Sequence, residues 1–164
     1  MTPYRISPGP GQESVWDYPR PPRLEPEPAE IRIVFDGEEI ARTTKAFRVL
    51  ETSHPPVYYL PPQAFAPGVL VPVAGTSVCE WKGRARYFDV IAGGRRAERA
   101  AWAYPDPTPA FAALRNHVAV YPAAMEACWV GDEQARPQPG RFYGGWVTDR
   151  IVGPFKGEPG TEGW

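Results

Sequence analysis

One pattern occurs three times in this sequence: two runs with apolar residues at alternate positions, joined by a pair that contains glycine. The three segments are IRIVFDGEEIAR (31–42), RYFDVIAGGRRAERAAW (86–102) and EACWVGDEQARP (126–137). Pairs such as Asp-Gly supply the positive φ angles of tight hairpin turns, and a period of two is typical of strands. The pattern therefore predicts a mainly β, antiparallel fold built from hairpins.

Proline, at 22 of 164 residues, limits how far regular structure can extend. Residues 1–30 hold eight prolines, a composition that favours polyproline II over helix or strand. Since Trp16 needs a place to bury, we expect this arm to dock on the rest of the chain. We expect residues 31–164 to form a single β-rich domain, and we expect its glycine- and aromatic-rich tail (141–164) to pack back on it or across a dimer.

The segment PAFAALRNH (109–117) is the one good helix candidate. Thr108 is placed as its N-cap and Pro109 at its first helical position. A buried strand is expected next, at 118–121, because VAVY is apolar and is closed by Pro122.

Charge and cysteine usage exclude several classes of function. The net charge of −1 gives no field that attracts nucleic acid or an anionic membrane. Cys79 and Cys128 form no CxxC pair, so we expect reduced thiols in a cytoplasmic protein and no metal. No run reaches the ~18 apolar residues of a membrane span. A nucleic-acid role would need a local patch built from Lys82, Arg84, Arg86, Arg95, Arg96 and Arg99.

The stretch VCEWKGRARYFDV (78–90) concentrates reactive and aromatic side chains before a strand. Glycine at a strand entrance indicates a bulge or a close backbone approach, so Lys82, which precedes Gly83, is expected to be aimed at a particular place. Cys79 is either a nucleophile whose thiolate Lys82 stabilises or a small buried hydrophobe. His54, in ETSHPPVYY, is either a general acid or base on a rigid loop or a partner of a backbone carbonyl.

Arg48 and Glu51 are candidate polar partners in a pocket. Strand alternation places them on opposite faces, so both line one pocket only if a bulge intervenes. Aromatic residues near proline-marked strand ends form either a large core or the wall of a pocket for a flat or apolar small molecule. These aromatic residues are Tyr58, Tyr59, Trp81, Tyr87, Trp102, Tyr104 and Tyr121.

Several blocks of the chain resemble a bacterial family catalogued as domain of unknown function 427: RVLETSHPPVYYLP, VCEWKGRARYF, AAWAYPDPTPAF, VAVYP and FYGGWVTDRIVGPFKG, within residues 12–164. The resemblance implies a β-tent-like fold, as in methionine sulfoxide reductase B and the thalidomide-binding domain of cereblon. Those relatives hold zinc on two cysteine pairs, which this chain lacks. The family's nucleotidyltransferase-like label implies nucleotide handling, which needs clustered carboxylates for Mg²⁺. Here the carboxylates are scattered at Glu51, Glu80, Asp89 and Asp106.

These observations predict a small antiparallel β-sandwich with one or two short helices and long irregular termini. Its function is hypothesised to be small-molecule binding, with catalysis left open and no cofactor implied. The pocket would lie near the CEWKG turn, with Tyr59, Trp81, Tyr87, Trp102 and Tyr104 as walls and Arg48, Glu51, His54, Cys79 and Lys82 as polar groups. If the site is catalytic, Lys82 holds an anion or a carbonyl, while His54 or Cys79 transfers a proton or attacks. The alternative is a protein-interaction or structural module, including a homodimer, that uses aromatic surface and proline-rich arms.

Overall fold

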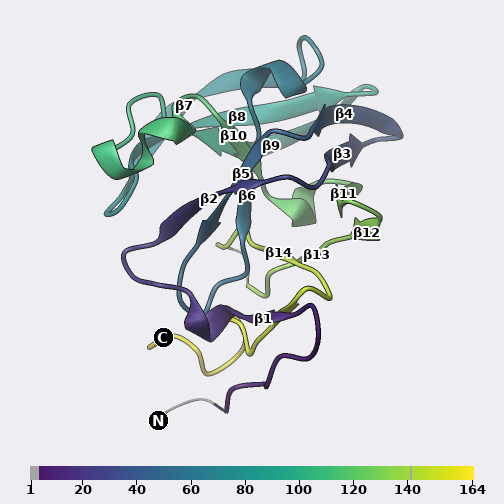
Figure 1. The fold of residues 1–164 in the computed structure, drawn as a ribbon. Helices are drawn as coiled ribbons and strands as arrows, with labels where there is room; N and C mark the ends of the chain where they lie inside the picture. The colour runs from purple at the N-terminus through teal and green to yellow at the C-terminus, as the bar shows by residue number, and fades with distance from the viewer. Residues whose placement is uncertain (1–3, 141) are drawn as a thin grey trace.

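The computed structural model describes residues 4–140 and 142–164 (Figure 1). Its antiparallel hairpins include the three expected from the turn signals, and two that were not expected, at residues 46–59 and 70–92. β3 (Ile31–Phe35) pairs with β4 (Glu38–Thr43) across Asp36-Gly37, and β8 (Gly83–Ala92) pairs with β9 (Arg95–Ala103) across Gly93-Gly94. All four turn residues have positive φ. β11 (Ala127–Val130) and β12 (Glu133–Gln134) form the third hairpin around Gly131. The mainly β, hairpin-built fold is confirmed.

The strands form two four-stranded sheets and three smaller ones. One large sheet has the order β10 (Val118–Val120), β9, β8, β7 (Leu70–Cys79), and the other has the order β12, β11, β3, β4. In a three-stranded sheet, β5 (Ala46–Leu50) lies between β2 (Arg23–Glu27) and β6 (Val57–Tyr59). The two-stranded sheets pair β1 (Glu13–Ser14) with β15 (Ile151–Val152) and β13 (Arg136–Pro137) with β14 (Trp146–Val147). Figure 1 shows the β7–β10 sheet at one end of the molecule and both termini at the other.

The main core lies between the two large sheets. In β3 every second side chain is buried, as the period of two predicts. Ile31 and Ile33 from this strand belong to the same apolar cluster as Val90 and Val120 from the opposite sheet. A second cluster is mostly aromatic and joins β5, β6, β9 and β10. The small β-sandwich is thus confirmed, and its aromatic cluster borders the site described below.

The predicted helix at 109–117 is shorter than expected. It corresponds to the 3-10 segment η3 (Pro109–Leu114), in which Phe111 departs from helical geometry with φ −115° and ψ 21°. Thr108 does not cap it through its side chain; its hydroxyl instead donates to the carbonyl of Trp81 at 2.6 Å. The remaining helical turns of the described residues are η1 (Val15–Asp17), η2 (Pro62–Ala64) and η4 (Pro122–Ala124).

The proline-rich N-terminal segment is partly a strand, which corrects the expectation of polyproline II throughout. β2 pairs with β5, and Pro26 is accommodated because β2 is an edge strand. Upstream, Val15 is buried, and the Trp16 ring meets the Trp164 ring edge-on with centroids 5.0 Å apart. Positions 1–3 of the arm and position 141 of the tail lie outside the described residues.

Candidate functional site

A cavity of about 550 Å³ opens where the β5–β6 loop, the end of β7 and the segment after β13 meet. Sequence-distant segments supply its wall: Val49, Glu51, His54, Pro55, Val57, Tyr59, Val78, Cys79, Lys82, Gln138, Phe142, Tyr143 and Gly144. The five predicted residues Glu51, His54, Tyr59, Cys79 and Lys82 are therefore brought together.

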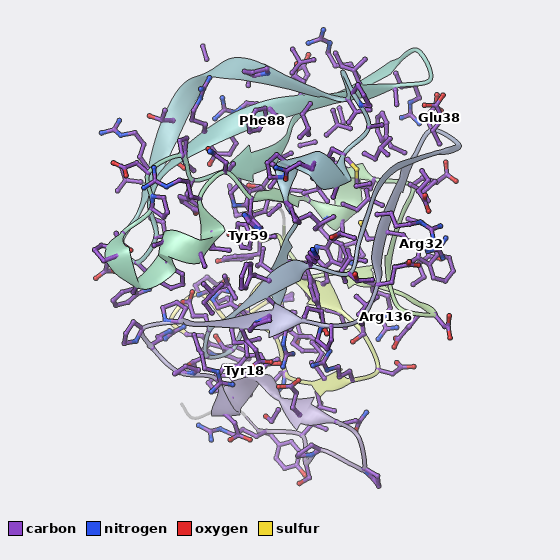
Figure 2. The ribbon with its side chains drawn as sticks, turned by 45° about the horizontal axis from the view of Figure 1, so that its top comes forward. Tyr18, Arg32, Glu38, Tyr59, Phe88 and Arg136 are labelled. Carbon is purple, nitrogen blue, oxygen red and sulfur yellow. The ribbon has the colours of Figure 1, made fainter. Side chains whose placement is uncertain are left out.

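A smaller cavity of about 190 Å³ adjoins the first and is almost entirely aromatic. Both cavities are lined by Val57, Tyr59, Lys82 and Phe142. The remaining wall of the smaller one consists of Tyr87, Trp102, Tyr104 and Tyr121. Figure 2 shows Tyr59 in the interior of the molecule, below the β7–β10 sheet. The two cavities thus form a polar and an aromatic compartment that share Lys82.

The backbone at Lys82 is fixed by its neighbours. Gly83 has φ +107°, and a Cβ placed there would come within 3.3 Å of the Asp106 carbonyl oxygen. The Lys82 carbonyl accepts a hydrogen bond from the Thr108 N–H at 3.1 Å. Only glycine combines this φ with so close a backbone approach. Gly83 therefore lets the turn dock on residues 106–108 and directs Lys82 toward the cavities.

Lys82 remains a cation although it is largely enclosed. Burial opposes its charge, but interactions with Tyr59, Cys79 and Glu51 outweigh the burial and raise the pKa of the ammonium. Its Nζ lies 5.8 Å from the centroid of the Tyr104 ring, within the range of a cation–π contact. Among the described residues, no carboxylate lies within 4.0 Å of this ammonium. Lys82 is therefore a positive charge that lacks an ionic partner.

The two cysteines differ in environment. Cys79 ends β7, is partly exposed and lines the larger cavity beside Lys82. Cys128 is buried in the main core, and burial raises the pKa of its thiol to about 12. Only Cys79 is therefore placed where a pocket ligand or a thiol reagent can reach it.

The tautomer of His54 is set by Gln138. The side-chain oxygen of Gln138 accepts a hydrogen bond from the Gly145 N–H at 3.1 Å, and Nε2 of Gln138 donates to the Lys156 carbonyl at 2.8 Å. The same Nε2 is 3.1 Å from His54 Nδ1, so it donates there and Nδ1 is an acceptor. The imidazole proton is then on Nε2, and His54 presents an N–H rather than a basic nitrogen.

Burial lowers the pKa of His54, Glu51 opposes this effect, and the positive charges of Arg20, Lys156 and Lys82 reinforce it. His54 is therefore neutral at pH 7. Its Nε2 is 3.7 Å from Glu51 Oε2, which is also 3.4 Å from Arg20 Nε. The Glu51 charge is thus already partly compensated from outside the cavity.

Two predicted pocket residues lie elsewhere. Arg48 is buried on the opposite face of β5 from Val49, where it pairs with Glu13 at 2.8 Å and with Glu25. Strand alternation separates it from Glu51, and no bulge overrides this alternation. Trp81 is only partly buried, packs against the aromatic cluster and lines neither cavity. Its backbone carbonyl, rather than its ring, contributes to the turn.

Several lining residues were not anticipated from the sequence. Gln138, Phe142 and Tyr143 belong to segments with no local signal of a site. The structure explains the two glycines of the YGGW block: a Cβ on Gly144 would lie 2.3 Å from the Trp102 ring, and one on Gly145 would lie 2.4 Å from Gln138 Oε1. Both glycines therefore allow a close approach to residues of the site.

The other charged groups do not assemble into a second centre. No group of three or more histidine, cysteine or acidic residues suited to a metal occurs in the described part of the chain. Arg95 and Arg96 pair with Asp36 and Asp89, and Arg99 lies over the Tyr87 ring at 4.2 Å. The basic residues considered for nucleic acid are thus partly neutralised.

The chain matches a known protein family. A family model described as a domain of unknown function (DUF427), with the short name NTP_transf_9, matches residues 23–131. This region contains Glu51, His54, Tyr59, Cys79 and Lys82 but ends before Gln138. No curated protein matches the chain. Among the described residues, no helix has the length and apolar character needed to cross a bilayer.

Proposed function

Because this chain belongs to the DUF427 family of domains of unknown function, we propose its function from the site itself: it binds a small molecule in the paired cavities beside Lys82. The observation that carries the proposal is the Lys82 ammonium, which lines both cavities and has no carboxylate partner among the described residues. Because no described carboxylate forms an ion pair with this ammonium, a negative group on a ligand would meet a positive charge that is available for a charge-assisted hydrogen bond.

The rest of the site has the composition of a ligand pocket. Such pockets commonly measure about 300–1,000 Å³, with mostly apolar and aromatic walls and a few convergent polar groups. The larger cavity, at about 550 Å³, lies in this range. Tyr59 and Val57 supply its apolar wall, while Lys82, Glu51 and the His54 N–H supply its polar groups.

If the site is catalytic, we infer distinct roles for three of its residues. Lys82 would hold an anionic or carbonyl oxygen, and Cys79 would be the nucleophile because its thiol lies in the same cavity. His54 would donate a hydrogen bond through Nε2, since accepting a proton at Nδ1 would break its bond to Gln138. General-base catalysis by His54 is therefore not part of the proposal.

A thermal-shift screen of metabolites tests the proposal. A ligand at 100 times its Kd stabilises the folded state by about 2.7 kcal/mol. For a domain of this size the melting temperature should rise by roughly 5–11 °C, at about 2–4 °C per kcal/mol. A Lys82→Met variant should lose the shift, whereas Lys45→Met, at an exposed lysine outside both cavities, should keep it. A broad screen with no stabilising compound would contradict small-molecule binding.

One observation favours the interaction module as a second candidate. Phe142 and Val78 are 85% and 72% exposed, and both stand at the wall of the larger cavity. Exposed apolar groups beside a pocket can contact a protein partner or a second copy as well as a ligand. If the chain is an interaction module that self-associates, Phe142→Ser should reduce self-association in sedimentation experiments. If it is not, both the wild type and Phe142→Ser should sediment as monomers.

A further inference from the structure

The dimensions of the aromatic cavity limit what can enter it. Its volume is about 190 Å³, and an apolar cavity of about 150 Å³ in another protein is known to hold one benzene molecule. The Trp102 and Tyr121 rings lie 4.5 Å apart at its wall, and Tyr59 meets Trp102 edge-on with centroids 6.3 Å apart. Since rings of this kind pack favourably against another ring, the compartment fits a single planar ring.

Some of the polar atoms of this compartment already have hydrogen-bond partners. Trp102 Nε1 donates to the Tyr59 hydroxyl at 3.2 Å, and the Tyr87 hydroxyl is 2.7 Å from the Ser77 hydroxyl. The walls therefore offer ring faces and edges together with hydroxyl groups, among them those of Tyr104 and Tyr121. Lys82 is the charged residue among the described lining of this compartment and also lines the larger one, so a negative group attached directly to the ring would meet the ammonium at their junction.

The charges around the junction select among negative groups. Among the described residues, 4–140 and 142–164, those that line the two cavities include no arginine and, as their one lysine, Lys82. Glu51 lines the larger cavity and would repel added negative charge. A phosphate ester carries about −1.5 to −2 charges at pH 7 and is best matched by forked arginine contacts. A carboxylate carries one charge, which a single ammonium can balance.

We propose that the ligand is a planar aromatic or heteroaromatic ring that carries one carboxylate. The ring occupies the aromatic compartment and the carboxylate pairs with Lys82, with the His54 N–H and the larger cavity available to further substituents. This inference rests on the proposed small-molecule function and narrows it to one chemical class. It predicts discrimination against nucleotides, which carry their negative charge on phosphate.

Four probes test each element: benzoate, its neutral analogue benzamide, phenyl phosphate, and acetate, which lacks the ring. Dissociation constants are measured by ligand-observed NMR titration at constant ionic strength. Benzoate should bind at least 10-fold more tightly than each of the other three. Lys82→Met should weaken the binding of benzoate at least 10-fold and leave the binding of benzamide unchanged. Unchanged benzamide binding would also show that the variant retains its pocket. Lys45→Met should behave as wild type, and Lys82→Gln provides a second, polar variant.

The outcomes separate the two proposals. The ring-carboxylate inference is overturned if phenyl phosphate or acetate binds as tightly as benzoate, or if Lys82→Met binds benzoate as tightly as the wild type does. Small-molecule binding would still stand in both cases. The same holds if the metabolite screen finds a ligand but benzoate does not bind. If neither the probes nor the screen yield binding, the proposed function itself fails.

Discussion

The packing of Gly144 against Trp102 gives a direct test of how the site is assembled. In Gly144→Ala the added Cβ would lie 2.3 Å from Trp102 Cη2, 3.2 Å from Cζ2 and 3.3 Å from Cζ3. Real Cβ atoms do not approach other heavy atoms at 2.3 Å, so the ring must shift. Trp102 is 8% exposed, packs on Tyr121 and donates to the Tyr59 hydroxyl, so it has little freedom to shift.

The expected magnitude follows from two opposing effects. Overpacking a close-packed interior costs about 1–3 kcal/mol. Replacing glycine by alanine where the backbone is compatible stabilises by about 0.4–1 kcal/mol, because the unfolded chain loses freedom. Gly144 does not have a φ that disfavours alanine. The net loss in free energy of unfolding should therefore lie between about 0 and 2.6 kcal/mol, and the loss relative to a glycine-to-alanine change that meets no contact should be about 1–3 kcal/mol. The melting temperature should fall by up to roughly 10 °C.

Urea denaturation of wild type, Gly144→Ala and Gly163→Ala measures this effect. Gly163 is a matched control, since it also lacks a positive φ and a Cβ there would meet no atom within 4 Å. Gly163→Ala should be neutral or slightly stabilising. Gly144→Ala should also weaken the binding of any ligand in the aromatic compartment, because the displaced Trp102 indole is part of the wall of that compartment. If Gly144→Ala is as stable as Gly163→Ala, then Trp102 is not held as described and the aromatic cavity is not a fixed compartment.

Three further predictions follow from other parts of the molecule. Iodoacetamide should alkylate Cys79 in the folded protein and Cys128 only after unfolding, as peptide mass spectrometry would show; equal labelling would contradict the placement of Cys128 in the core. Arg48→Met should lower the free energy of unfolding by about 1–3 kcal/mol, because Glu13 and Glu25 lose a buried partner. The control Arg86→Met, at an exposed arginine, should change the free energy of unfolding by less than about 0.5 kcal/mol. The pKa of His54 is lowered in the folded state. Its contribution to stability is therefore fully present above the unfolded-state pKa of about 6.5 and is lost as pH falls through the folded-state pKa. In urea denaturation, His54→Gln should reduce the loss of stability between pH 7.5 and 5, and His117→Gln should not.

The elements that the sequence predicts correctly are those set by neighbouring residues. Asp36-Gly37 and Gly93-Gly94 determine their turns through local φ preferences, so the hairpins could be read without knowing the partner sheets. Gly83 likewise indicated a close backbone approach, which the structure places against residues 106–108. Alternation correctly separated Arg48 from Glu51, because a strand preserves its period of two until a bulge interrupts it.

The elements that could not be predicted depend on contacts between distant segments. Gln138 reaches His54 across 84 positions, and this bond, which fixes the histidine tautomer, leaves no local trace in ETSHPPVYY. The helix expected at 109–117 was judged from capping residues. Phe111, which is 2% exposed, instead packs in the aromatic cluster, and its backbone leaves the helical geometry. Tertiary packing overrides local preference at both places.

The short name of the family model refers to nucleotidyl transfer, and the structure allows that chemistry to be weighed residue by residue. Transfer between phosphates relies on carboxylates that hold Mg²⁺ and on several positive groups around the phosphates. Here Asp89 accepts from Arg96 and from the Arg99 N–H, while Asp106 and Glu80 are exposed. Of the acidic residues that the structure describes, Glu51 alone lines the cavity, next to Lys82 and a neutral histidine. That set of charges suits one negative charge better than a triphosphate. Comparing the dissociation constants of benzoate and phenyl phosphate therefore decides whether this site binds a carboxylate or a phosphate.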